Sequence, residues 1–213
     1  MHFLSEDLEN YVVRHSQLEP ELLKELEKET YKKVIHPRML SGHFQGRVLS
    51  MLSKIINPAA VLEIGTYTGY SAICLAEGLQ EGGTIDTIDI NEELEDLQRS
   101  FFNRSGYGEQ IIQHVGNALD IIPTIDKTFD LVFIDADKEN YGAYFDLVVD
   151  KVRPGGIILS DNVLWSGQVL DPEKFPDKST RSLVAYNKKL HEDSRVETVL
   201  LPIRDGLTVS RVK

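Results

Sequence analysis

The sequence predicts an α/β fold: a Rossmann-like, doubly wound and mostly parallel sheet with an antiparallel C-terminal edge hairpin and N-terminal helices. Three observations carry this prediction. From Pro58 onward, short apolar runs alternate with longer helical stretches. The short runs are unbroken and rich in β-branched residues, which is typical of strands buried on both faces of a parallel sheet. The last two runs lie too close together for a parallel crossover, so they predict a hairpin.

The N-terminal part of the chain has helical periodicity. Ser5 can cap a helix over Glu6–His15. Pro20 opens a charged amphipathic run, and a further apolar pattern begins near His43. We expect these segments to form a helical cap on the sheet.

The remaining elements alternate between the two periods. Each predicted strand is a short apolar run, and each predicted helix repeats its apolar residues every three to four positions. Because ligands of such sheets bind at the carboxyl ends of the parallel strands, the site is expected there. The predicted strands are Ala60–Ile64, Thr84–Ile88, Ile111–Val115, Phe129–Ile134, Gly156–Ser160, Val196–Leu201 and Leu207–Val212; the predicted helices are Ser71–Leu79, Glu92–Asn103, Tyr141–Val152 and Ser182–Glu192; and Trp165–Lys178 is predicted to be a surface loop.

Length and composition limit the class of protein. A chain of 213 residues gives one domain a full hydrophobic core and is barely long enough for two domains. We therefore expect one domain over residues 1–213, with the helical cap over residues 1–57 and the Rossmann-like core over residues 58–213. The formal net charge of -11 has the wrong sign for binding nucleic acid through its phosphates. No apolar stretch approaches the ~18 residues of a membrane span, and the acidic start is unlike a secretory leader. We therefore expect a cytoplasmic protein whose single cysteine, Cys74, is a buried structural thiol.

The loop after the first strand predicts a nucleoside site. Gly65–Gly69 forms a glycine turn between strand and helix, but Tyr67 occupies the position where a dinucleotide site needs its middle glycine. The tyrosine ring disfavours a pyrophosphate, whereas Asp89 at the end of the next strand can accept two ribose hydroxyls. S-adenosylmethionine fits both features, with its amino-acid part directed to Glu63. Ordinary strand connections remain the alternative.

A second group of polar residues follows two later strands. Asp135 comes directly after Phe129–Ile134, and Asp161 and Asn162 come directly after Gly156–Ser160. This oxygen-only set suits magnesium first, with manganese or calcium as alternatives, and is poorly suited to zinc. Lys138 is close enough in sequence to act as the base on a hydroxyl held there. The alternatives are loop-capping residues and a solvated lysine paired with Asp137 or Glu139.

Several ordered motifs resemble the cation-dependent class I O-methyltransferases, which include the caffeoyl-CoA and catechol O-methyltransferases and bacterial relatives. The similarity extends from about His36 to the C-terminus. It departs from the family pattern at Arg204, where these sequences often carry glycine, and over Val169–Arg181, so the natural acceptor is not implied. The motifs are Leu62–Ser71, Ile88–Asn91, Phe133–Tyr141, Asp161–Gly167 and Leu201–Thr208.

This resemblance implies a role for each site residue. It implies S-adenosylmethionine as cofactor, a divalent cation, and a homodimer formed through the N-terminal helices. An ordinary core role for Trp165 stays open. The residues implied at the cofactor are Glu63, Gly65, Tyr67 and Ser71 at its methionine part, Asp89 at the ribose, Ala118 at the adenine, and also Met39 and Asp135. The residues implied at the metal are Asp135, Asp161 and Asn162, and Lys138 is the implied catalytic base. The residues implied at the acceptor are Met39, Ser41, Lys138, Trp165 and Asn187.

Together these features predict a magnesium-dependent O-methyltransferase that acts on vicinal aromatic diols of the catechol or caffeoyl type. Three alternatives remain. A tRNA hydroxyuridine O-methyltransferase would use the same metal and lysine, although the net charge is unfavourable. A nicotinamide oxidoreductase is opposed by Tyr67, and a non-catalytic scaffold would have no need of the lysine and the oxygen ligands.

Overall fold

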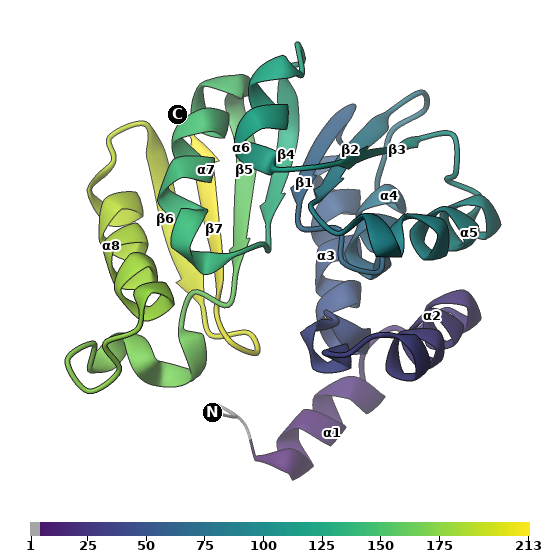
Figure 1. Cartoon of the computed structure of the whole chain (residues 1–213), viewed down its shortest axis with the longest axis horizontal. Coiled ribbons are helices and arrows are strands. Elements are labelled where there is room, and N and C mark those ends of the chain that lie inside the picture. The colour runs from purple at the N-terminus through teal and green to yellow at the C-terminus, as the bar shows by residue number, and fades with distance from the viewer. Residues whose placement is uncertain (1–4) are drawn as a thin grey trace.

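The computed structural model describes residues 5–213 and contains a seven-stranded sheet in the order β3-β2-β1-β4-β5-β7-β6 (Figure 1). Strands β1 to β5 pair in parallel, and β7 pairs antiparallel with both β5 and β6. The predicted fold class is therefore confirmed, including the hairpin at the edge. The strands are β1 (Ala60–Ile64), β2 (Thr84–Asp89), β3 (Ile111–Val115), β4 (Phe129–Ile134), β5 (Val152–Asp161), β6 (Val196–Leu201) and β7 (Leu207–Val212).

The N-terminal part is helical, as predicted. The Ser5 hydroxyl accepts a hydrogen bond from the Leu8 amide at 3.4 Å and caps the first helix, and Pro20 immediately precedes the second. The first four residues of the expected cap lie outside the described residues. The helices are α1 (Glu6–Arg14), α2 (Glu21–Lys33) and α3 (Gly42–Ile56), with a short 3-10 turn, η1 (Pro37–Met39), before α3.

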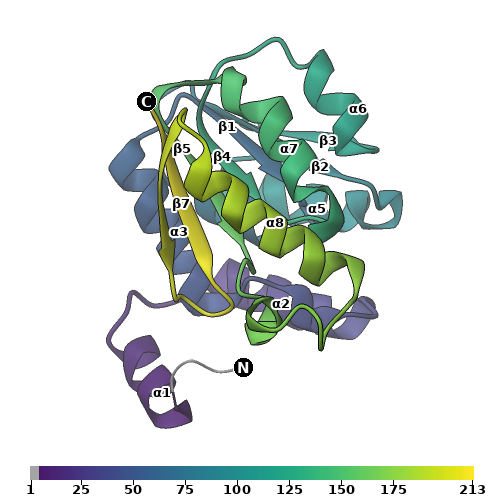
Figure 2. The ribbon, with the colours of Figure 1, turned by 90° about the vertical axis from the view of Figure 1, so that its left-hand side faces the viewer.

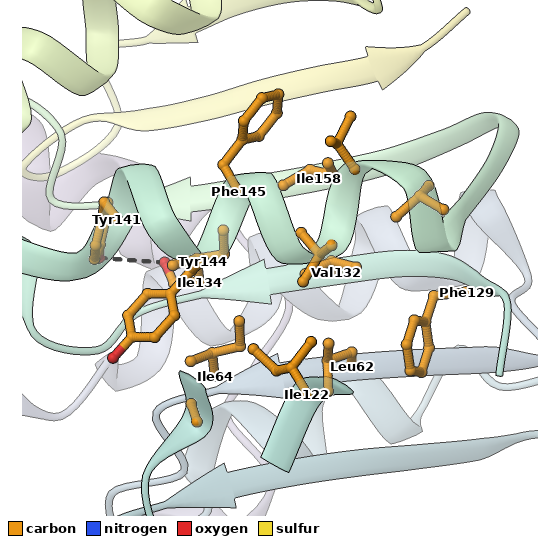
Figure 3. Packing of buried hydrophobic residues seen from close by; sticks show 14 of the residues in the cluster. Leu62, Ile64, Ile122, Phe129, Val132, Ile134, Tyr141, Tyr144, Phe145 and Ile158 are labelled. Carbon is orange, nitrogen blue, oxygen red and sulfur yellow. Dashed lines mark hydrogen bonds between the residues drawn. The ribbon is translucent and has the colours of Figure 1, made fainter. Parts of the chain in front are cut away.

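Helices cover both faces of the sheet, and each face has its own apolar cluster. Helices α2, α3, α4 and α5 pack on one face, whereas α6, α7 and α8 pack on the other (Figures 1 and 2). Figure 3 shows the second cluster, in which Phe145 of α7 lies over Ile158 and Val132 of the sheet. The remaining helices are α4 (Tyr70–Ala76), α5 (Glu95–Ser105), α6 (Ala118–Ile121), α7 (Tyr141–Val148) and α8 (Lys178–Glu192).

Strand β1 shows why the sheet needs apolar residues at every position. Val61 belongs to the cluster under α3 and α4, whereas Leu62 and Ile64 belong to the cluster under α6 and α7. Because successive side chains point to opposite faces, Glu63 must lie on the same face as Val61. This places a fully buried carboxyl group at the end of a central strand, where it needs a functional explanation.

The structure differs from the predicted elements after β5. Helix α8 begins at Lys178, before the predicted Ser182, because the Asp177 side chain caps it by accepting a hydrogen bond from the Thr180 amide at 2.9 Å. The predicted surface loop begins with a 3-10 segment, η6 (Trp165–Leu170). Within residues 5–213, no helix is both long and apolar enough to cross a bilayer.

Candidate active site

The carboxyl ends of β1 and β4 touch at Gly65. This residue has φ of +102°, and a Cβ atom added to it would lie 2.1 Å from the Asp135 carbonyl oxygen. The Asp135 amide in turn donates to the Ile64 carbonyl at 2.9 Å. Only glycine allows this approach, so the nucleoside loop and the first of the candidate metal ligands are joined through backbone.

Tyr67 connects the glycine turn to two other parts of the site. Its backbone is left-handed, with φ of +51°. Its amide donates to Asp89 Oδ2 at 2.5 Å, and its hydroxyl donates to the His36 carbonyl at 3.0 Å. The side chain therefore extends from the turn to the segment that precedes α3. Burial raises the pKa of the Tyr67 hydroxyl, so it stays protonated as a donor.

Asp89 is the last residue of β2. Oδ2 accepts from Tyr67, and Oδ1 accepts from the Asn91 amide at 2.8 Å. Burial raises the pKa of Asp89, and these backbone donors oppose the shift. A carboxylate offers about four lone-pair sites, so the group still has acceptor capacity for two hydroxyls of a ribose.

Glu63 carries an unpartnered buried oxygen. The Thr87 hydroxyl donates to Oε2, but Oε1 has no hydrogen-bond partner among residues 5–213. Burial raises the pKa of Glu63 to about 8, although the hydroxyls of Ser71 and Thr87 oppose the shift. An unpaired buried acceptor is unfavourable, and the amino group of the methionine part of the cofactor would supply the missing donor. The site therefore fits S-adenosylmethionine at this point.

Ala118 lies beside the Asp89 end of the site. It is the first residue of α6, and the Asn117 side chain caps the helix by accepting from the Leu119 amide at 3.0 Å. The Gly116 amide donates to the Asp89 carbonyl at 2.8 Å. This hydrogen bond places Ala118 next to the position expected for the ribose, where an adenine ring would follow.

Met39 and Ser41 lie on the segment that Tyr67 contacts. Met39 ends η1 and is 64% exposed, so its side chain is free to cover a ligand. Ser41 immediately precedes α3 and is buried. The hydrogen bond from Tyr67 to His36 holds this segment beside the glycine turn.

Asp135 and Asp161 meet at the ends of two paired strands. Ile134 of β4 is opposite Ser160 of β5, so the next residue of each strand, Asp135 and Asp161, comes to the same edge. Burial, and next the negative charge of Asp135, raise the pKa of Asp161. A divalent cation would offset this negative charge.

Asn162 completes the oxygen set that was predicted from the sequence. It has φ of +57°, and its amide donates to Asp161 Oδ1 at 2.8 Å. Among residues 5–213 there is no group of three or more His, Cys, Asp or Glu side chains that could hold a metal. A cation here would therefore depend on the Asn162 amide oxygen as well as on the two carboxylates, a donor set that fits magnesium.

Lys138 is buried against Asp135. Its Nζ donates to Asp135 Oδ1 at 2.9 Å and to the Tyr141 hydroxyl at 2.6 Å. The alternative pairing with Asp137 or Glu139 is wrong, because Asp137 accepts from Tyr144 and Glu139 pairs with Lys178.

Tyr141 was not recognised as a site residue from the sequence. It is fully buried, and its hydroxyl accepts from Lys138 and donates to the Asp161 carbonyl at 3.0 Å. Burial and the charges of Asp135 and Asp161 raise its pKa well above the usual value. Its position three residues after Lys138 was the available signal, because a helical turn places such residues together.

The residues expected at the acceptor include one on the loop after β5 and one on α8. The Trp165 amide donates to the Asn162 carbonyl at 3.1 Å, while the Trp165 side chain packs partly buried against the cluster under α7 and α8. Both readings of this residue are therefore compatible with its position. Asn187 of α8 donates to the Val163 carbonyl at 2.8 Å, and its buried Oδ1 has no partner among residues 5–213.

Two further residues contact Asp161 directly or through one side chain. Gln45 of α3 is 1% exposed, and its Nε2 donates to Asp161 Oδ2. Its Oε1 accepts from Arg204, which lies in the turn between β6 and β7. Neither contact was predicted, because each joins residues far apart in the chain.

Comparisons with known proteins agree over nearly the whole chain. Residues 13–213 match a family model described as O-methyltransferase. The chain is 39% identical over 222 residues to caffeoyl-CoA O-methyltransferase 2 of Zea mays, covering 97% of this chain and 83% of that protein. It is 37% identical over 225 residues to caffeoyl-CoA O-methyltransferase 1 of Arabidopsis thaliana, covering 97% of this chain and 85% of that protein.

Solved structures with the same architecture contain the cofactor or its product. The O-methyltransferase of Bacillus cereus in complex with SAH has a TM-score of 0.91 and 30% identity, covering 97% of each chain. The O-methyltransferase TomG of Streptomyces achromogenes in complex with SAM has a TM-score of 0.90 and 30% identity, covering 97% of this chain and 96% of that chain.

Proposed function

This chain belongs to the O-methyltransferase family and is an S-adenosylmethionine-dependent O-methyltransferase of the caffeoyl-CoA type, and we propose that its acceptor is a vicinal aromatic diol bound with a divalent cation, magnesium by preference. One observation carries this proposal. Asp135 and Asp161 lie at the ends of the paired strands β4 and β5, and the buried amine of Lys138 contacts Asp135. The relatives named for caffeoyl-CoA support an acceptor with neighbouring hydroxyls.

The cofactor would lie along the ends of β1 and β2. Glu63, with its unpaired Oε1, would accept from the amino group, and Ser71 lies beside it at the start of α4. Asp89 would accept from the ribose hydroxyls, and Ala118 would contact the adenine. Because Gly65 joins the ends of β1 and β4, a cofactor held by these residues would lie beside Asp135.

Asp135, Asp161 and Asn162 would hold the cation. When bound, it would stabilise negative charge on the acceptor oxygen, lower the pKa of the reacting hydroxyl and reduce the attraction of Asp135 for the ammonium of Lys138. In its neutral amine form, Lys138 would take the proton of that hydroxyl with its lone pair, and the Tyr141 hydroxyl keeps Nζ in place.

Methyl transfer then needs alignment more than covalent chemistry. When bound, the cofactor would supply the methyl group: the acceptor oxygen would bond to the methyl carbon as the bond from carbon to sulfur breaks, which would leave a neutral thioether. Alignment of this kind contributes up to ~7–11 kcal/mol in well-oriented systems. Trp165 and Met39 would shape the pocket that holds the aromatic ring, and Asn187 and Ser41 would border it.

We also propose that the chain forms one domain and assembles as a homodimer. One sheet with an apolar cluster on each face supports a single domain. Helix α1 buries none of its residues, and Leu8 and Tyr11 are more than half exposed, which supports contact of the N-terminal helices with a second copy.

Removal of divalent ions tests the proposed function. Protein treated with a chelator is expected to lose methyl transfer to catechol, protocatechuate, caffeate and caffeoyl-CoA, and added magnesium or manganese is expected to restore it. The transfer is measured with S-adenosylmethionine labelled in its methyl group, and a phenol without a neighbouring hydroxyl is the control acceptor. Undiminished transfer after chelation would exclude the cation, and equal transfer to the control phenol would exclude the diol requirement.

A further inference from the structure

Arg204 has a backbone conformation that favours glycine. It lies in the turn between β6 and β7, and its φ is +50°. A side chain in the left-handed region is unfavourable unless surrounding contacts compensate for it. Such an outlier therefore requires an account of what the side chain contributes.

The Arg204 side chain crosses from the C-terminal hairpin to the start of α3. Its Nη1 donates to the Ser41 carbonyl and to Gln45 Oε1, the second at 2.6 Å. Gln45 is buried, with 1% of its surface exposed. The guanidinium thus reaches a buried amide that also contacts Asp161.

A guanidinium can only donate hydrogen bonds and an ionised carboxylate can only accept them, so Arg204 and Asp161 together determine how the Gln45 amide is oriented. Oε1 must face Arg204, so Nε2 is directed away from it and donates to Asp161 Oδ2. The Asn162 amide donates to the other oxygen, Oδ1, at 2.8 Å. The Asp161 carboxylate is therefore held on both oxygens, and one of these contacts depends on Arg204 through Gln45.

The turn does not need the Arg204 side chain for its own shape. The Gly206 amide donates to the Ile203 carbonyl at 2.9 Å, and the Leu164 amide donates to the Asp205 carbonyl at 2.9 Å. The Ser166 amide donates to Asp205 Oδ1 at 2.5 Å. Glycine at position 204 would keep all three contacts and would relax the left-handed backbone.

We propose that Arg204 is a positioning residue which, through Gln45, fixes the Asp161 carboxylate in the orientation that holds a divalent cation together with Asp135. This inference rests on the proposed function, because it assigns Asp161 to the cation. Residues that hydrogen-bond a metal ligand typically change metal affinity 10–100-fold when removed. Arg204 would act in this way on Asp161 through Gln45, which contacts both residues.

The substitution Arg204→Gly separates positioning from folding. Binding of Mn²⁺ to the full-length protein, stripped of metal and saturated with S-adenosylhomocysteine, is measured by calorimetry, and thermal unfolding is measured on the same samples. Arg204→Gly is expected to weaken Mn²⁺ binding about 10-fold or more without lowering the unfolding temperature. Arg204→Lys, which keeps the charge but not the forked donors, is expected to recover part of the affinity.

Two further variants serve as controls. Asn57 has the same φ of +50° and lies at the opposite end of α3 from Gln45, so Asn57→Gly removes the same backbone cost elsewhere. It is expected to bind Mn²⁺ as the unsubstituted protein does. Gln45→Ala is expected to weaken binding, and adding Arg204→Gly to it is expected to weaken binding no further, because the two residues act as one unit.

The outcomes are distinguishable. If the unsubstituted protein binds Mn²⁺ and Arg204→Gly binds it equally well, the positioning role is wrong and the proposed function stands. If the loss of binding in Arg204→Gly comes with a lowered unfolding temperature, the residue has a structural role and the inference is overturned. If the unsubstituted protein binds no Mn²⁺, both the inference and the cation of the proposed function are wrong.

Discussion

The proposed function places Glu63 at the amino group of the cofactor, which would link the ionisation of Glu63 to cofactor binding. Its pKa is raised to about 8, mainly by burial, so the neutral form is favoured in the free protein below that pH. The stability that the neutral form gives is fully present below the ordinary carboxyl pKa of ~4.3 and is lost as the pH rises through about 8. A bound ammonium group favours the ionised form instead. Cofactor affinity should therefore increase with pH toward this value.

Calorimetric titration with S-adenosylhomocysteine between about pH 6 and pH 8 tests this expectation. The affinity of the unsubstituted protein is expected to rise across the range, because less free energy is needed to ionise Glu63. Glu63→Gln, which cannot ionise, is expected to bind more weakly with a flatter profile. The same slope in both proteins would assign the pH dependence to another group.

The proposed function assigns proton transfer to Lys138. Lys138→Met keeps the apolar stem and removes the amine, so kcat is expected to fall by ~10²–10⁴. Affinity for S-adenosylhomocysteine is expected to stay nearly unchanged, because the amine contacts Asp135 and Tyr141. Lys178→Met is the matched control, since that side chain is 82% exposed and pairs with Glu139 at 3.5 Å. Near-normal kcat in Lys138→Met would remove the lysine as the base.

At the scale of elements, the close contact between the ends of β1 and β4 makes the protein sensitive to substitution of Gly65. Gly65 and Gly82 both have positive φ, but only Gly65 has neighbouring atoms where a Cβ would lie. Gly82→Ala is expected to cost ~1–2 kcal/mol of unfolding free energy from its backbone alone. Gly65→Ala adds a steric clash with Asp135, for a total of ~2–5 kcal/mol.

Urea unfolding of the two variants measures this difference, and binding of S-adenosylhomocysteine measures its effect on the site. Only Gly65→Ala is expected to weaken binding, because the clash displaces the turn that carries Tyr67. Equal destabilisation of the two variants would mean that the strand ends can separate without cost.

The elements that could be predicted from the sequence are those with a strong local pattern. Three of the strands with the predicted bounds are Ala60–Ile64, Ile111–Val115 and Phe129–Ile134. Each is an apolar run between polar turns, so the turns determine where a strand buried in the sheet begins and ends. The strand predicted over Gly156–Ser160 lies within the longer β5, and its end beside β4 still placed Asp135 and Asp161 at one edge. The short α6 was missed because four residues, Ala118–Ile121, are too few to show helical periodicity.

The contacts between distant segments could not be predicted in the same way. Gln45 and Asp161 are separated by 116 residues, and Arg204 and Gln45 by 159 residues. No local pattern identifies such partners, because they depend on how α3 and the hairpin pack against the finished sheet. Arg204 was noticeable only as a residue where glycine is usual, and the structure supplies the reason through its contacts.

At the scale of the whole molecule, the negative net charge favours a small-molecule acceptor over a nucleic acid. The formal net charge of -11 repels phosphates, and a tRNA substrate would have to overcome this at low salt, where electrostatic repulsion is least screened. No tRNA retention is expected in a gel-shift measurement at about 50 mM salt, and no methyl transfer to tRNA is expected under conditions that methylate a diol. A shift that weakens as salt is added would instead support a hydroxylated tRNA base as the acceptor.

The position of β7 between β5 and β6 has a consequence for the order in which the site matures. During synthesis the cofactor turn at Gly65 and the strands β1 to β4 emerge long before residues 202–212, which supply Arg204 and the last neighbour of β5. A nascent chain is therefore expected to acquire its nucleoside pocket early and its acceptor side late. Bound cofactor could then act as a template on which the C-terminal hairpin docks, since ligands stabilise the states that bind them.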